Sequence, residues 1–127
     1  MLYEKYARGT IDEVCDRLAQ ATTANGFGVL GAHDLKQKMA EKGVEFGPAC
    51  RILEVCNPVQ AKCALEANLS ISTALPCRIS VFERGGQVVV STLRPTELLA
   101  LFGNPELKAV ARDVETTLLR IIDAACA

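Results

Sequence analysis

Two helical patterns bracket a series of strand-like segments, and this order constrains the fold more than any other feature of the sequence. The first helix is predicted from Thr10, which forms a Thr-x-x-Glu capping box with Glu13. The second is predicted to begin at Asn104-Pro105. It has the clearest helical period in the chain, with apolar residues at Leu107, Val110, Ala111, Val114, Leu118, Ile121, Ile122 and Ala125. Because strands and helices are segregated rather than alternating, an antiparallel sheet is favoured.

The strand-like segments fall on both sides of the first helix. One precedes it at residues 2–7, and four follow it at residues 27–33, 50–56, 75–83 and 87–93. Arg84-Gly85-Gly86 suits a tight hairpin between the last two. Short helices are predicted at residues 34–43, 58–67 and 96–103. The sequence therefore predicts a single domain over residues 1–127, of the α+β class. It is a two-layer fold in which an antiparallel sheet carries two long helices on one face, in the order strand-helix-four strands-helix.

The second face of this sheet is not cleanly polar. In residues 50–56 one side would carry Cys50, Ile52, Glu54 and Cys56, and the other Arg51, Leu53 and Val55. A strand with one face in water normally alternates apolar with polar residues. Neither set here is purely polar, so both faces of the sheet are expected to be covered. A homodimer formed across the sheet would cover the second face, and short helices of the same chain are the alternative.

Charge and composition argue against several classes of partner. The 14 Lys and Arg residues against 15 Asp and Glu residues leave a net charge of −1, without the basic footprint of a nucleic-acid-binding protein. No apolar run approaches the ~18 residues of a membrane span, and the N-terminus lacks a signal-peptide pattern. We therefore expect a cytoplasmic protein that binds neither nucleic acid nor membrane, with six cysteines that remain free thiols.

Familiar catalytic motifs are missing from the sequence. The glycines Gly26, Gly28 and Gly31 match the dinucleotide pattern, but they follow a helix and lie on a predicted strand, so we interpret them as residues of a turn and of close packing. A nucleophile with a histidine base would have to use His33, the sole histidine. A lone histidine at a strand end is more often structural, and no catalytic residue is predicted.

Cys56 and Cys77 are the strongest candidates for a site. If the strands at 50–56 and 75–83 are antiparallel neighbours, Cys56 lies opposite Cys77 on one face, and Cys50 lies near Glu83. A parallel crossover would place Cys77 beside Cys50 instead.

Cys56 also precedes the Asn57-Pro58 helix start, and a helix N-terminus lowers a thiol pKa and attracts anions. Two thiols are fewer than the four ligands of a zinc site, so no metal site is predicted, and simple packing is the common role of free cysteine.

Four segments resemble the domain of unknown function 302 family: "FGVLGAHDLKQKMAEKGVEF", "CNPVQAKCALEA", "LPCRISVFE" and "FGNPELKAVARDVE". The resemblance extends over nearly the whole chain, and its Cys-Asn-Pro and Leu-Pro-Cys signatures fall on Cys56 and Cys77. It implies a small α+β domain of the TATA-binding-protein-like class that forms homodimers, but no activity, substrate or cofactor. Many relatives have Asn after the second cysteine, where this chain has Arg78.

The sequence thus favours a non-enzymatic protein that binds a small, anionic ligand near Cys56, Asn57, Cys77 and Arg78. One alternative is a thiol redox, sulfur-handling or soft-metal protein that uses Cys56 and Cys77. Another is a structural interaction module that needs neither thiol. No cofactor follows from the sequence.

Overall fold

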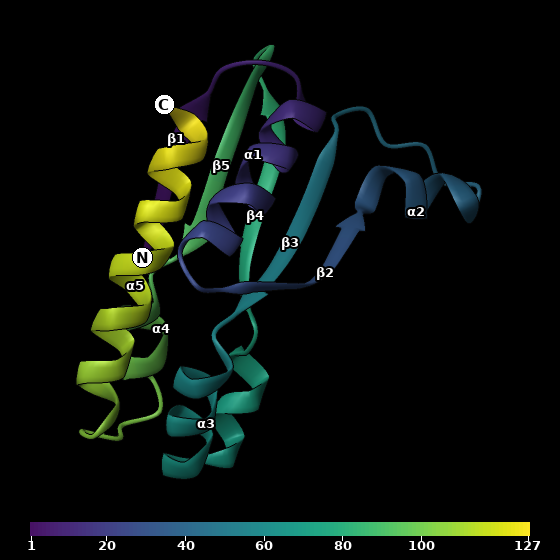
Figure 1. Cartoon of the computed structure of the whole chain (residues 1–127). Helices are drawn as coiled ribbons and strands as arrows, with labels where there is room; N and C mark the ends of the chain where they lie inside the picture. Colours follow the sequence, from purple (N-terminus) through teal and green to yellow (C-terminus); the bar gives the residue numbers. More distant parts are fainter.

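A five-stranded antiparallel sheet forms the centre of the molecule, which is described over all 127 residues by a computed structural model (Figure 1). Its strands lie in the order β1-β5-β4-β3-β2. They are β1 (Leu2–Ala7), β2 (Gly28–Asp34), β3 (Cys50–Cys56), β4 (Cys77–Arg84) and β5 (Gln87–Leu93). The predicted α+β fold and its order of strand, helix, four strands and helix are confirmed.

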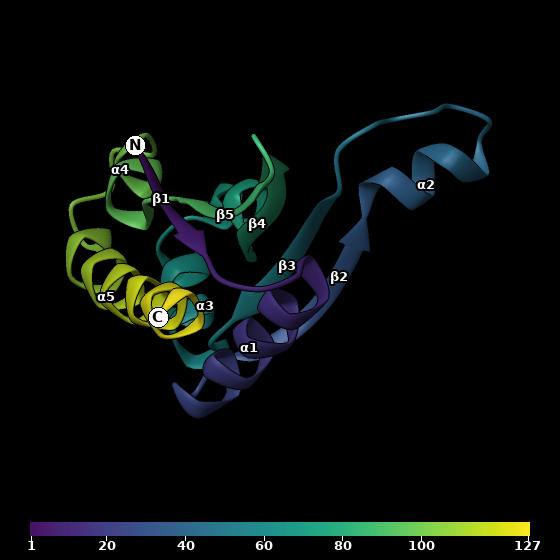
Figure 2. The same ribbon diagram turned by 90° about the horizontal axis from the view of Figure 1, so that it is seen from above.

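The two long helices, α1 (Ile11–Ala24) and α5 (Leu107–Cys126), lie on the same face of the sheet (Figure 2), as predicted. Their apolar stripes meet the inward side chains of the strands in the main core. This core has 13 buried residues: Val14, Leu18, Phe27, Leu53, Val55, Ile79, Val81, Val88, Val90, Leu118, Ile121, Ile122 and Ala125. Burial of these side chains is the principal stabilising contribution to the fold.

The two long helices begin in different ways. The capping box predicted for α1 is confirmed, because Thr10 Oγ1 accepts from the Glu13 N–H and the Glu13 carboxylate accepts from the Thr10 N–H. The predicted start of α5 at Asn104-Pro105 is too early. The Asn104 carbonyl accepts from the Leu107 N–H in a turn before the helix, and its side chain accepts from the Asn68 amide. The helix therefore begins at Leu107, without a side-chain cap.

The register between β3 and β4 differs from the expectation by one residue. Cys77 pairs with Val55, not with Cys56, and Cys50 pairs with Phe82, not with Glu83. A shift of one residue exchanges the two faces of a strand. Cys77 therefore shares the helix-covered face with Val55, whereas Cys56 belongs to the opposite face. The observed register is the one that buries Val55 and Leu53 together with the apolar residues of β4 on one side.

Short helices occupy the ends of the sheet. At one end, α3 (Pro58–Ala67), the 3-10 helix η1 (Leu69–Ala74) and α4 (Pro95–Ala100) surround the lower end of α5 (Figure 1). The sequence predicted α3 and its Asn57 cap but not η1. At the opposite end, α2 (Leu35–Glu41) and the loop after it project from the body as an arm, residues 35–48 (Figure 2). Its Val44 and Phe46 side chains are 52% and 42% exposed.

Two glycines have the predicted roles, one in a turn and one in close packing. Gly26 has a φ of +78° in the turn between α1 and β2, a conformation that side chains disfavour. Gly31 lies at a bulge in β2, and a Cβ there would approach the Glu54 carboxylate to 2.9 Å. The glycine at this position therefore leaves room for the Glu54 side chain on the face opposite the two long helices.

Candidate functional site

An apolar hollow of about 530 Å³ opens at the end of the sheet where α3, η1, α4 and α5 gather. We call it the end pocket. Its walls come from the adjacent ends of β3, β4 and β5, from α3, and from the α4–α5 region, with Leu2 of β1 beside them. Most of its 26 lining residues are hydrophobic, among them Phe27, Ala64, Leu75, Leu98, Phe102 and Val114. Its volume and apolar lining are typical of a small-molecule site.

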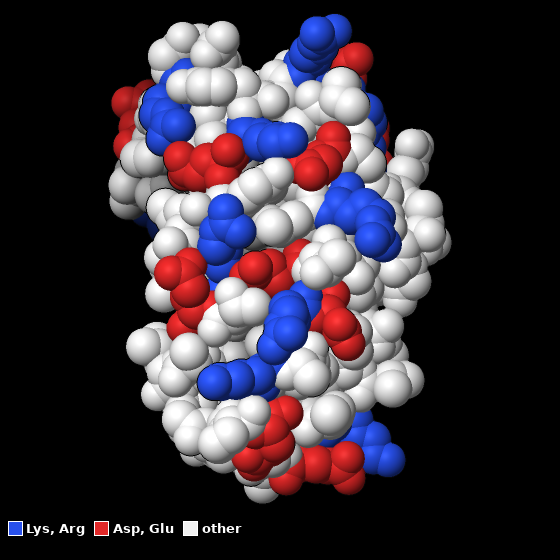
Figure 3. Space-filling view, turned by 90° about the vertical axis from the view of Figure 1, so that its left-hand side faces the viewer, with Lys and Arg blue, Asp and Glu red and all other residues white.

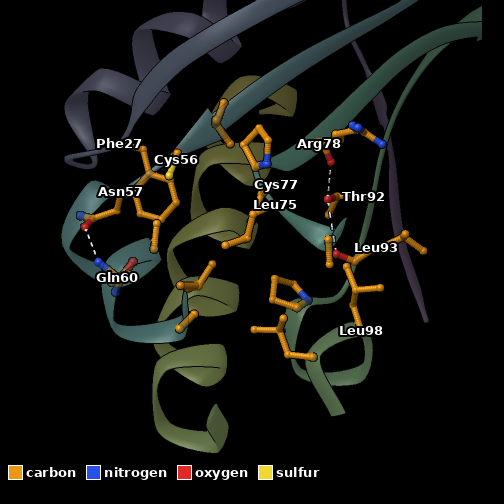
Figure 4. Close-up of a pocket in the computed structure, with 18 of the residues that line it drawn as sticks. Phe27, Cys56, Asn57, Gln60, Leu75, Cys77, Arg78, Thr92, Leu93 and Leu98 are labelled. Atoms are coloured by element: carbon orange, nitrogen blue, oxygen red, sulfur yellow. Dashed lines mark hydrogen bonds between the residues drawn. The ribbon is translucent and has the colours of Figure 1, made fainter. Parts of the chain in front are cut away.

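All four residues predicted for the site line the end pocket. Cys56 and Asn57 stand where β3 passes into α3, and Cys77 and Arg78 stand at the start of β4. Figure 4 shows Cys56 and Asn57 on one side of the hollow and Arg78 on the other, with Cys77 between them. The four residues therefore lie at one end of the sheet, although Cys56 and Cys77 belong to opposite faces of the sheet.

The α3 N-terminus is closed by its own cap. Asn57 Oδ1 accepts from the Gln60 N–H, and the Asn57 carbonyl accepts from the Ala61 N–H. Pro58 has no N–H to offer. Asn57 Nδ2 donates to the Gly26 carbonyl. Most of the donors that make a helix N-terminus attractive to an anion are therefore already in use.

The pKa of each of the two thiols is raised, which disfavours the reactive thiolate form. Burial raises the pKa of Cys77 to about 11, with a smaller contribution from Cys56, which lies near enough to interact with it. Burial also raises the pKa of Cys56. This is the opposite of the lowering expected from the α3 N-terminus. Since the thiolate is the nucleophile and the metal ligand, neither thiol is activated in this structure.

The single histidine belongs to an ionic cluster outside the apolar interior. His33 Nε2 lies 2.8 Å from Glu54 Oε1, and Arg78 Nε lies 3.6 Å from Glu54 Oε2. The hydrogen bond from His33 is the main cause of a lowered pKa at Glu54, and Arg78 adds to it. The Arg78 side chain is 65% exposed, so its guanidinium lies at the rim of the pocket.

One residue that lines the end pocket, Gln60, has a buried side-chain atom without a partner. Gln60 Oε1 is buried and accepts no hydrogen bond. Two hydroxyl groups among the lining residues are engaged elsewhere, because Thr73 donates to the Ser70 carbonyl and Thr92 donates to the Arg78 carbonyl. Sequence reasoning missed Gln60, and its position three residues after the Asn57 cap was the only signal that could have drawn attention to it.

Three observations concern metal ligands, membrane spans and surface charge. No group of three or more His, Cys, Asp or Glu side chains is placed to hold a metal ion. None of the helices combines the length and apolar character needed to span a bilayer. Figure 3 shows Lys and Arg side chains interspersed with Asp and Glu over one face, without a large basic patch on that face.

Two comparisons with known proteins agree with this description. The model of the family described as "Domain of unknown function DUF302" matches residues 3–125. A crystal structure of an uncharacterised conserved protein DUF302 from Bacillus stearothermophilus has 33% sequence identity to this chain. It superposes with a TM-score of 0.93, and the match covers 99% of this chain and 98% of that chain. Among curated proteins, no match to the chain was found.

Proposed function

Since the chain belongs to the DUF302 family, whose description names no activity, we propose a function from the geometry: the protein binds a small, largely apolar ligand in the end pocket. The observation that carries this proposal is the apolar hollow of about 530 Å³ that the four predicted residues Cys56, Asn57, Cys77 and Arg78 line. The role is binding rather than catalysis, in a cytoplasmic protein whose cysteines stay reduced.

The lining of the end pocket favours an apolar ligand. Side chains such as Phe27, Leu75 and Leu98 face a space that water would fill with few hydrogen bonds. Transfer of apolar ligand surface from water into such a space contributes about 25 cal/mol per Å². Pockets of this size can enclose most of the surface of a small molecule. An apolar molecule is therefore a better fit than a polar one.

A compact anion, the ligand first expected from the sequence, fits less well. The α3 N-terminus is occupied by its Asn57 cap, so it offers few free N–H groups. Arg78 is the only charged residue that lines the pocket, and it already faces Glu54 from an exposed position. An anionic group is therefore better placed at the rim than in the interior of the pocket.

A thiol redox or soft-metal function has weaker support. It would require Cys56 and Cys77 to act as thiolates, whereas burial raises the pKa of both. It would also require further ligands for a metal, and no third His, Cys, Asp or Glu joins the two thiols. We therefore assign these cysteines to the wall of the pocket.

Filling the end pocket tests the proposal. Nile red is an uncharged dye that fluoresces strongly in apolar surroundings, and the wild type is expected to bind it at one site. Ala61 is half-buried in the pocket wall on α3, so Ala61→Trp should fill the space and abolish this binding. Ala109→Trp, on the exposed surface of α5, is the matched control and should bind the dye normally. Equal binding by the two variants would contradict the proposal.

We further propose that two copies of the chain associate through the sheet face opposite α1 and α5. The alternation of β1 and β5 places Leu2, Tyr6 and Leu93 on this face. Leu2 and Tyr6 are 56% and 57% exposed, and no long helix covers them (Figure 2). A row of large exposed apolar side chains on one face is typical of a protein interface. The exposed Val44 and Phe46 of the arm would extend such an interface.

A further inference from the structure

Resting on the proposed function and on the proposed dimer, we propose that the end pocket of one copy is closed by the sheet face of the second copy. A bound ligand then touches both copies, and its binding strengthens the dimer. The inference rests on the place where the mouth of the pocket lies, on the charges around the mouth and on the area of the sheet face.

The end pocket reaches onto the uncovered sheet face, the face opposite α1 and α5. Side chains alternate between the two faces of a strand, and Leu53, Ile79 and Val90 mark the face that the long helices cover. The alternation and the strand pairing place six of the lining residues on the other face: Leu2, Ile52, Arg78, Ser80, Ser91 and Leu93. Four neighbouring strands therefore carry the pocket onto the face proposed for the dimer.

A single copy leaves this part of the pocket open. Leu2 and Leu93 line the pocket and are nevertheless 56% and 45% exposed. Figure 4 shows Leu93 and Arg78 on the side of the hollow across from Cys56. Tyr6 lies on the same face of β1 as Leu2, four residues away, which is about 13 Å along a strand. A partner that covers Tyr6 and extends across the face therefore also covers the mouth.

The charges on this face are balanced within one copy, which favours a second copy as the partner. Arg84 Nη2 lies 3.3 Å from Glu4 Oε1, and Arg78 Nε lies 3.6 Å from Glu54 Oε2. Two faces of large net charge would repel each other, whereas here each arginine faces a glutamate of its own copy. A strongly charged partner would find no net charge of opposite sign to recognise.

The area of the face indicates that the partner must cover all of it, the mouth included. The sheet has five strands. Strands about 4.8 Å apart and roughly 20 Å long give a face of roughly 500 Å², so two copies bury roughly 1,000 Å². A specific interface needs about this area, so a dimer that left the mouth uncovered would fall below it. The exposed Val44 and Phe46 of the arm add further apolar surface.

Tyr6→Glu separates the dimer from the pocket, because Tyr6 lies on the interface but does not line the pocket. At a protein concentration at which the wild type is dimeric, this variant should bind Nile red about ten-fold more weakly. Loss of roughly 55 Å² of covered ligand surface corresponds to that factor. Ala109→Glu on the exposed surface of α5 is the matched control and should bind the dye as the wild type does.

Two checks make this comparison specific. The same variants carrying Ala61→Trp give the fluorescence of dye bound outside the pocket, which is subtracted. Thermal denaturation shows whether each variant is folded.

A second measurement needs only the wild type. Light scattering gives the dimer dissociation constant with and without saturating 1-octanol, a small apolar probe. A ligand that binds the dimer more tightly than the monomer must strengthen the dimer by the same factor for each molecule bound. Saturating 1-octanol should therefore lower the dissociation constant by about ten-fold or more. This measurement decides the matter if Tyr6→Glu does not fold.

The possible outcomes separate this inference from the proposed function. If Tyr6→Glu is monomeric but binds Nile red as tightly as the wild type, or if 1-octanol leaves the dimer dissociation constant unchanged, the pocket is complete within one copy. The inference is then wrong while the proposed function stands. The same holds if the wild type is always monomeric or if Tyr6→Glu remains fully dimeric, since the interface is then not on this face. If Ala61→Trp does not alter Nile red binding, the end pocket is not a binding site, and both proposals fail.

Discussion

The main core and the end pocket are built from the same strands, yet one is closed and the other is open. In the main core, α1 and α5 lie directly on the sheet, and residues such as Val55 and Ile79 are fully buried. At the pocket end, the small helices α3, η1 and α4 meet in a second cluster of only five buried residues. Leu75 and Phe102 pack against that cluster but remain partly exposed to the hollow.

This difference separates residues that stabilise the fold from residues available for a ligand. A side chain that is fully buried by its neighbours contributes stability and has no free surface. A half-buried apolar side chain in a concave wall keeps surface that a ligand can cover. The contrast leads to four predictions.

The largest effect is expected on stability. Ile79→Ala in the main core should lower the free energy of unfolding by about 2–5 kcal/mol, because it leaves a cavity among fully buried side chains. Leu98→Ala in the wall of the end pocket should cost about 1 kcal/mol or less, because its side chain already faces open space. Urea denaturation measures both values. Similar losses in the two variants would show that the pocket end is packed as tightly as the core.

The next effect concerns the reactivity of the two thiols. With a pKa of about 11 instead of the ordinary 9.0, Cys77 has about 100-fold less thiolate near neutral pH. Its alkylation by iodoacetamide should therefore be slower than that of the exposed Cys63 by about two orders of magnitude. Peptide mass spectrometry after timed labelling gives both rates. Faster labelling of Cys77 than of Cys63 would revive the thiol-based alternative.

A smaller effect is expected at the uncovered sheet face. Tyr6→Glu places a charge on the proposed dimer interface and should raise the dimer dissociation constant about ten-fold or more, since burial of an unpaired charge is unfavourable. Ala109→Glu on the exposed surface of α5 is the control and should leave the dimer intact. Light scattering across a range of concentrations measures the constant. A wild type that is monomeric at all concentrations would contradict the dimer.

The smallest effect belongs to the ionic cluster on that face. The hydrogen bond from His33, with the charge of Arg78, lowers the pKa of Glu54 in the folded protein. Its contribution to stability is therefore present above the unfolded carboxyl pKa of about 4.3 and is lost as the pH falls through the lower, folded value. With Glu54→Gln, the free energy of unfolding should fall slightly less steeply at acid pH, on the acid limb of its pH dependence. An unchanged acid limb would mean that the cluster does not stabilise the fold.

The sequence predicted the fold well because its signals were local. The capping box at Thr10, the apolar stripe of α5 and the Gly85-Gly86 turn each depend on neighbouring residues. The register of β3 against β4 was missed by one residue, because it depends on which strand residues α1 and α5 bury. That information lies in the packing of distant segments.

The candidate site was predicted in part for the same reason. Cys56, Asn57, Cys77 and Arg78 stand beside recognisable helix and strand boundaries, so the sequence drew attention to the end of the sheet where the end pocket lies. The apolar walls from α4 and α5 could not be foreseen, because they reach the pocket only through the tertiary fold. Gln60 is notable only because its oxygen is buried without a partner, and no sequence pattern reports burial of one atom.

The central claim is that the end pocket binds an apolar ligand, and a nuclear magnetic resonance titration tests it most directly. Adding 1-octanol to the ¹⁵N-labelled protein should shift the amide signals of Gln60, Ala61 and Leu98 in a saturable manner. The signals of the Gly85-Gly86 hairpin, far from the pocket along the sheet, should stay unchanged. The absence of saturable shifts, or shifts spread over the exposed apolar residues of the surface, would contradict the claim.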